Sequence, residues 1–120
     1  NNHKRRDWFM YTHTEQFGVV VVSINSEVSM QNAMNLRNWV VDNLIKKGKV
    51  KLVFDLTNAN SIDSFGLGTF VSLHKSALSA GGAVAFACAN ENIKKLLSMT
   101  ALDKVIKNYN TVTEAVNALK

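Results

Sequence analysis

The pair Asp63-Ser64 stands where an apolar β-type run has passed through a small polar turn and a helical pattern begins. A hydroxyl at that position lies beside backbone N–H groups that have no partner inside the helix. Those groups and the helix dipole favour negative charge, so the position suits a phosphate. We therefore predict that Ser64 is a phosphorylation switch. Spacing alone leaves a second interpretation open, a simple helix cap.

Other chemistries lack the residues that they need. The histidines are scattered and the lone cysteine has no cysteine or histidine at ligand spacing, so we expect surface histidines and a buried thiol rather than a metal site. Residues 65–69 lack the lysine of a phosphate-binding loop, and Ser64 lacks the flanking glycines of a hydrolase nucleophile. We expect no enzyme and no cofactor. The residues considered as metal ligands are His3, His13, His74 and Cys88.

The composition is that of one ordinary globular domain. The chain has 120 residues, of which 47% are hydrophobic and 19% charged. No apolar run approaches the roughly 20 residues that cross a bilayer, so no membrane insertion is expected. The net charge of +5 could indicate nucleic acid or an acidic partner, but most lysines fall at expected helix ends and turns, which disfavours direct nucleic-acid binding. A single cysteine fits a reducing, cytoplasmic setting.

Apolar patterning predicts the elements that position Asp63-Ser64. Residues 1–7, which include three consecutive basic residues, are expected to be a flexible tail or added residues, and a single domain is placed at 8–120. The first two strands are expected to pair as a hairpin across a turn at residues 15–18. Strands are expected at residues 8–14, 19–24, 49–56, 83–89 and 102–106.

Helical spacing separates these strands. Ser29 and Asn90 are expected N-caps, and Thr111 with Glu114 forms a capping box. Gly66 and Gly68 cost the second helix roughly 1 kcal/mol each relative to alanine, which indicates close approach of another group to its backbone. Helices are expected from Met30 to a Lys46-Lys47-Gly48 end, at 64–80 with Leu78 on its apolar face, at 91–99, and after Thr111.

The alternation of strands and helices predicts an α/β fold with crossover connections and a largely parallel sheet. Residues 50–89 read as an apolar strand, Asp-Leu, a short turn, Ile-Asp-Ser-x-Gly-Leu-Gly, a helix, Gly-Gly and an apolar strand. This pattern resembles the STAS domain, specifically the bacterial anti-sigma factor antagonists. Further matches are residues 19–24 to the family's second strand, 26–28 to its Gly-Glu-Leu turn, 93–102 to its Leu-Leu and Thr-x-Leu signature, and 114–115 to its closing helix.

The resemblance implies a STAS-like mixed, mostly parallel sheet of about five strands with four helices packed against it. It also implies that the serine after the motif aspartate, here Ser64, is phosphorylated by the anti-sigma factor, a serine kinase. The unphosphorylated form binds this kinase and frees the sigma factor, and a PP2C-type phosphatase restores the hydroxyl. Asp63 matches the aspartate beside the phosphoacceptor. The expected docking residues are Met30, Ile62, Asp63, Phe65, Gly66 and Leu67.

Two positions depart from the family pattern, and two other functions stay open. Phe65 stands where a small residue is usual, and could either shield Ser64 or anchor the partner. Ser29 replaces a frequent aspartate. A STAS domain can also serve as a scaffold, such as an accessory subunit of a transporter or a stressosome-like assembly, with Ser64 as a helix cap. A nucleotide or small-molecule binding module is the third possibility.

Overall fold

Strands and helices alternate along the computed structural model, which describes residues 11–120. The strands are β1 (Tyr11–Gln16), β2 (Val19–Ile24), β3 (Lys51–Asp55), β4 (Ala83–Ala87) and β5 (Asn108–Tyr109). The helices are α2 (Ala33–Asn43), α3 (Ser64–Ser79), α4 (Glu91–Met99) and α5 (Val112–Leu119), with 3₁₀ turns at Ile45–Lys47 and Leu102–Lys104. The expected order of elements and the α/β fold class are confirmed.

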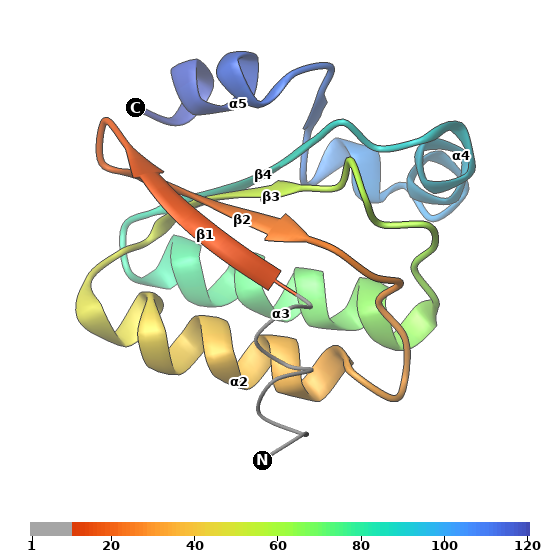
Figure 1. Ribbon diagram of the computed structural model, residues 1–120, viewed down its shortest axis with the longest axis horizontal. Coiled ribbons are helices and arrows are strands. Elements are labelled where there is room, and N and C mark those ends of the chain that lie inside the picture. Colours follow the sequence, from red (N-terminus) through yellow and green to blue (C-terminus); the bar gives the residue numbers. More distant parts are fainter. Residues whose placement is uncertain (1–10) are drawn as a thin grey trace.

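The five strands form one mixed sheet in the order β1-β2-β3-β4-β5. β1 and β2 are the predicted antiparallel hairpin, joined by Phe17 and Gly18 at φ 54° and 78°, and the other neighbours are parallel. Parallel neighbours require crossover connections, and the connecting helices cover both faces of the sheet. Helices α2 and α3 pack side by side on one face and α5 lies on the other (Figure 1).

The side chains of the central strands divide between two cores, because successive residues of a strand point to opposite faces. In β3, Leu52 and Phe54 enter the larger core under α2 and α3, whereas Val53 enters the smaller core under α5. The larger core is centred on Phe70 of α3, whose ring meets those of Phe54 and Phe86 edge-on at centroid distances of 5.0 Å. Both faces of the central strands are thereby covered.

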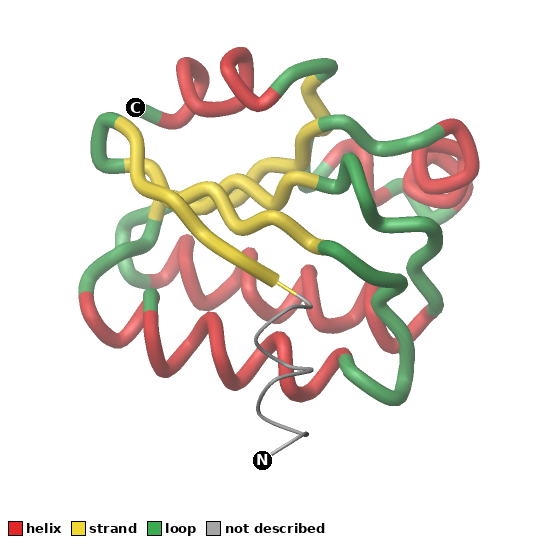
Figure 2. Tube along the Cα trace, in the orientation of Figure 1, coloured by secondary structure: helices red, strands yellow, loops and turns green. Residues whose placement is uncertain are grey.

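The loops that follow β2 and β3 leave the same end of the sheet and lead into α2 and α3 (Figure 2). Helix α4 lies across this end (Figure 1). Asp63 and Ser64 are therefore placed where three connections meet, at the carboxyl ends of parallel strands, which is where ligand sites of such sheets occur. Between residues 11 and 120, no helix is both long and apolar enough to cross a bilayer.

Two expectations about apolar residues are wrong. Residues 102–106 do not return to the sheet. They form the 3₁₀ turn Leu102–Lys104, and Ile106 turns into the larger core with no exposed surface. The fifth strand is the two-residue β5 that follows. Leu78 is 57% exposed, because the apolar stripe of α3 that meets the sheet passes through Leu73 and Ala77 instead.

The boundaries of the first described helix also differ from the expectation. The backbone C=O of Ser29 accepts bonds from the N–H groups of Asn32 and Ala33, so Ser29 begins a turn and α2 itself starts at Ala33. At the other end the α-helix stops at Asn43, and a 3₁₀ turn carries the chain to Gly48 at φ 81°. The predicted first strand extends to residue 16, while its residues 8–10 and the predicted tail 1–7 lie outside the described part.

The glycines after α3 provide a test of the packing. Gly82 passes so close to the residue before β3 that an added Cβ would lie 1.9 Å from the Val50 carbonyl oxygen, whereas a Cβ at Gly68 would meet nothing within 4 Å. Gly82→Ala is therefore expected to lower the free energy of unfolding by about 1–3 kcal/mol. Gly68→Ala, the matched control inside α3, is expected to raise it by up to about 1 kcal/mol. Urea unfolding measures both, and an unaltered Gly82→Ala variant would contradict the packing described.

Candidate functional site

The carboxylate of Asp63 joins two segments that are distant in sequence. Asp63 is the N-cap of α3, and its Oδ1 accepts a hydrogen bond from the Gly66 N–H at 2.9 Å. Its Oδ2 accepts from the Met30 N–H, also at 2.9 Å, in the turn before α2. One side chain therefore fixes the start of α3 against the start of α2.

The backbones of the same two loops are also paired. Val28 and Ile62 form an isolated parallel bridge, in which the Val28 N–H donates to the Ser61 carbonyl and the Asp63 N–H donates to the Val28 carbonyl, each at 3.0 Å. A Cβ on Gly66 would lie 2.6 Å from the Val28 carbonyl oxygen. The close approach predicted from the glycines is thus confirmed at Gly66, but at Gly68 the space is open.

Hydrogen bonding lowers the pKa of Asp63. The largest cause is the Gly66 N–H, partial desolvation opposes it, and the N–H groups of Met30 and Phe65 add to the lowering. The carboxylate is therefore ionised near neutral pH. It also uses the N–H groups that the sequence argument left for a phosphate, so the start of α3 is not an unoccupied anion site.

Ser64 is the first residue of α3, and its side chain is exposed. Its hydroxyl makes no hydrogen bond to any residue from 11 to 120, so it points into solvent without an internal partner. Phe65 and Met30 flank it on the two tied segments and are 56% and 64% exposed. An accessible hydroxyl thus stands beside a fixed carboxylate and two exposed apolar side chains.

Three predicted docking residues lie beneath this surface rather than on it. Ile62 is 5% exposed and Leu67 8%, both within the larger core, and Gly66 is buried against Val28. Each of the three therefore offers only a small part of its surface to a partner. They hold Asp63, Ser64 and Phe65 in position from below.

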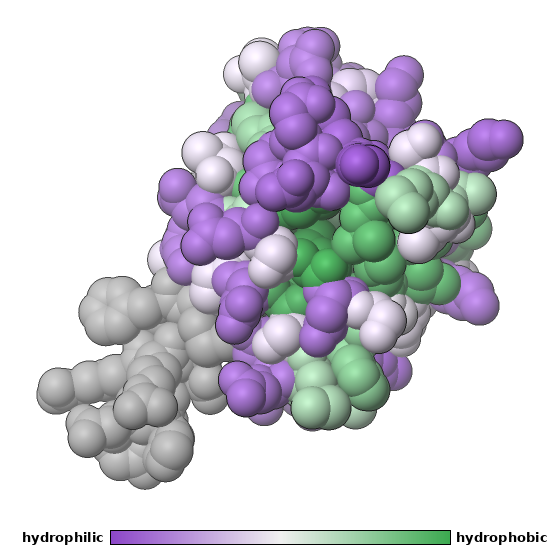
Figure 3. Space-filling model, turned by 90° about the vertical axis from the view of Figure 1, so that its right-hand side faces the viewer, coloured by the Kyte–Doolittle hydropathy of each residue, from purple (hydrophilic) through white to green (hydrophobic). Residues whose placement is uncertain are grey.

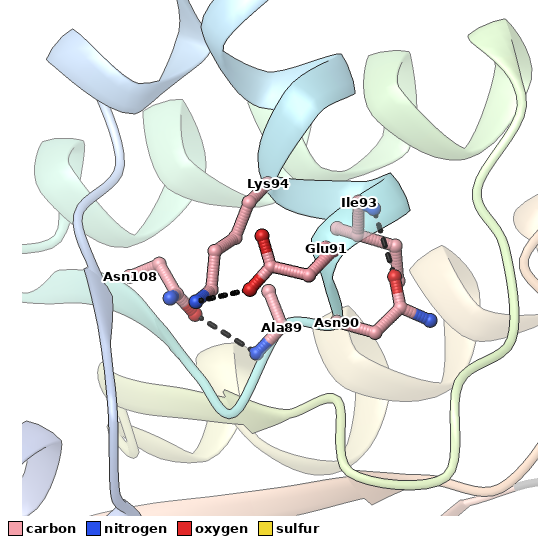
Figure 4. Close-up of polar contacts among 6 residues, drawn as sticks. All are labelled: Ala89, Asn90, Glu91, Ile93, Lys94 and Asn108. Carbon is pink, nitrogen blue, oxygen red and sulfur yellow. Dashed lines mark hydrogen bonds and ion pairs between the residues drawn. The ribbon is translucent and has the colours of Figure 1, made fainter.

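The structure places α4 beside the loop that leads to Ser64, a neighbour that the sequence did not predict. Asn90 caps α4 through the Ile93 N–H at 2.8 Å, as expected (Figure 4). Its Nδ2 also donates to the Asn60 carbonyl at 3.1 Å. α4 is thereby tied to the loop that leads to Ser64. Between them lies a hollow of about 240 Å³, on a face where Figure 3 shows apolar residues gathered at the centre. It is lined by Ser61, Ile62, Asn92, Ile93 and Leu96.

The candidate metal ligands remain apart. Within residues 11–120 no three side chains of histidine, cysteine, aspartate or glutamate come together. His13 packs edge-on against Trp39 at a centroid distance of 5.1 Å. Cys88 is partly exposed rather than buried, with its Sγ 3.5 Å from the Asn110 carbonyl oxygen. His3 falls outside the described part of the chain.

The double role of Asp63 predicts a pH dependence of stability. Because folding lowers its pKa, the carboxylate stabilises the fold fully above its ordinary pKa of 3.8 and progressively less as the pH falls further. Asp63→Asn keeps only one acceptor oxygen for two N–H groups, so the variant should unfold at a lower urea concentration than the unmodified chain at pH 7. The difference in free energy of unfolding between the two should become smaller below about pH 4. Asp103→Asn, at an exposed carboxylate of the turn after α4, is the control. If the stability difference caused by Asp63→Asn is the same at pH 7 and below pH 4, the role given to the ionised Asp63 carboxylate is contradicted.

Comparison with known proteins identifies the family of the domain. The STAS domain family model matches residues 11–115. A Thermotoga maritima protein named as an anti-sigma factor antagonist is 38% identical over 102 residues, 85% of this chain and 90% of that protein. An anti-sigma F factor antagonist of Paenibacillus polymyxa is 25% identical over 103 residues, 86% of this chain and 88% of the relative.

A solved structure shows the same fold. The crystal structure of an anti-sigma factor antagonist from Thermotoga maritima aligns with a TM-score of 0.88 at 35% identity, covering 95% of this chain and 97% of that one. The matched residues 11–115 contain both tied loops and α4. The resemblance seen in the sequence is confirmed, and the chain belongs to the STAS domain family.

Proposed function

We propose that this protein is an anti-sigma factor antagonist whose binding to a serine-kinase anti-sigma factor is switched by phosphorylation of Ser64. The observation that carries the proposal is the exposed Ser64 hydroxyl, free of hydrogen bonds within residues 11–120 and set on a backbone that Asp63 holds fixed. Relatives named as antagonists, at 38% and 25% identity, support the choice of partner. A PP2C-type phosphatase would restore the hydroxyl.

The physical effect of the modification follows from charge. A phosphate adds about −1.5 to −2 charges next to the ionised Asp63 carboxylate, whose N–H donors are already used. In a docked complex this charge must lose its water, and a penalty of about 3 kcal/mol weakens binding more than a hundredfold. No rearrangement of the fold is needed.

Phe65 acts as an anchor for the partner in this proposal rather than as a shield. A ring that shielded Ser64 would cover the hydroxyl and lie against it, but both side chains are exposed. An aromatic side chain that remains 56% exposed beside a recognition residue has surface to bury on docking.

Phosphate transfer tests the switch. The chain is incubated with the cognate kinase and ATP, and the modified residue is located by mass spectrometry. Transfer is expected at Ser64 and is expected to disappear in Ser64→Ala, while Ser79→Ala, an exposed serine at the other end of α3, retains it. Transfer that persists in Ser64→Ala defeats the assignment.

The complex itself separates this function from a scaffold role. Ser64→Asp and the phosphorylated chain are both expected to bind the anti-sigma factor more weakly, the phosphorylated chain by more than about a hundredfold. Calorimetric titration measures the loss. A stable complex that is indifferent to Ser64→Asp would instead favour a scaffold in which Ser64 is only part of a helix start.

Phe65→Ala is expected to weaken the same complex by about tenfold or more, because it removes an aromatic side chain from the centre of the docking surface. Phe17→Ala is the matched control, since Phe17 is 76% exposed at the tip of the β1–β2 hairpin. Equal affinity of the Phe65→Ala variant and the control would show that Phe65 is no anchor. Faster phosphorylation of Ser64 in Phe65→Ala would identify it as a shield.

A further inference from the structure

We propose that the hollow between α4 and the loop before α3 receives one bulky apolar side chain of a protein partner, presented beside carboxylates. The proposal rests on the proposed function, because it names the second half of the surface that contains Ser64. Its walls are Ile62 on the loop and Ile93 and Leu96 on the helix, with Ser61 and Asn92 at the rim.

The size and lining of the hollow fit a side chain. An apolar cavity of about 150 Å³ is large enough to bind benzene. The hollow here measures about 240 Å³, and its three large lining residues carry no polar side-chain atom. Figure 3 shows apolar residues gathered at the centre of this face, with polar residues above them and to the left. A phenylalanine, leucine or methionine side chain fits this shape and chemistry.

The occupant is a protein rather than a small molecule because apolar surface continues beyond the hollow. Met99 lies three residues after Leu96, on the same side of α4, and is 74% exposed. Phe65 follows Ile62 by three residues, at the start of α3, and is also mostly exposed. A ligand confined to the hollow would leave both side chains in water, whereas a docked protein surface covers them.

Charge specifies the neighbours of the inserted side chain. The segment of residues 91–107 carries four lysines against one glutamate and one aspartate. Lys94 is paired with Glu91 at 3.2 Å, but Lys95, exposed on the next position of α4, has no ion pair within residues 11–120. A partner segment with carboxylates beside its apolar residue would complement Lys95.

Both walls are fixed before anything binds. Asn90 holds the first turn of α4 and the Asn60 carbonyl together, and the Ala89 N–H donates to the Asn108 side chain of β5 at 3.1 Å (Figure 4). On the other side, the bridge between Val28 and Ile62 fixes the loop. Binding therefore costs little ordering of this surface, which favours a hollow that is used as it stands.

A random-peptide library displayed on phage tests the inference without the kinase. Selection against the unmodified chain is expected to enrich peptides that carry a bulky apolar residue next to aspartate or glutamate. Asn92→Trp, which fills the hollow from an exposed helix position, should reduce their affinity by about tenfold or more. Asn117→Trp on α5, across the sheet, should leave it unchanged.

The charge component has its own variant pair. Lys95→Glu is expected to weaken the selected peptides severalfold, whereas Lys47→Glu, exposed in the 3₁₀ turn after α2, is expected to have no effect. Peptides without an acidic and apolar signature, or peptides that bind Asn92→Trp as well as the unmodified chain, overturn the inference. If Ser64 receives no phosphate from the kinase, the proposed function fails and the peptide result stands, so the two failures are distinguishable.

Discussion

The Asp63 carboxylate is the contact on which the site depends, because it joins two loops that the sheet alone would leave independent. One oxygen closes the first turn of α3 through Gly66, and the other holds Met30 at the start of the α2 turn. A side chain with a single acceptor could not bind both N–H groups at once. The position of Ser64 is therefore fixed relative to α2 as well as to its own helix, and its hydroxyl stands on a rigid corner of the fold.

That corner depends in turn on a residue without a side chain. The Val28 carbonyl accepts a bond from the Asp63 N–H only because Gly66 leaves room for it, since a Cβ would lie 2.6 Å from that oxygen. The glycine weakens a helix that would be more stable with alanine in isolation. Its compensation is a tertiary contact, and the large apolar side chains buried below, Ile62 and Leu67, hold the same contact from the core side.

Local chemistry explains what the sequence could predict. Caps at Asn90 and Thr111 and the close approach at Gly66 are set by neighbouring residues, so they could be recognised without a structure. The predictions of a buried Leu78 and of a strand at residues 102–106 were wrong because an apolar residue has the same character whether it faces the sheet, the core or solvent. Only the packing of α3 and α4 decides which of these surroundings it has. The bond from Asp63 to Met30 spans 33 positions and leaves no local pattern. The hollow beside α4 could not be predicted for the same reason, because its lining residues come from two segments that are distant in sequence.

The occupied start of α3 decides which kind of switch this site can be. At many helix starts an added phosphate finds free N–H donors and orders the segment around it. Here the carboxylate of Asp63 already holds the Gly66 N–H, so a phosphate on Ser64 gains few donors and adds like charge beside an ionised neighbour. Separating the two charges by moving Asp63 would break its bond to Met30 and release the α2 turn. The arrangement therefore favours a phosphate that stays in solvent and acts on the partner by repulsion, with the fold itself unchanged.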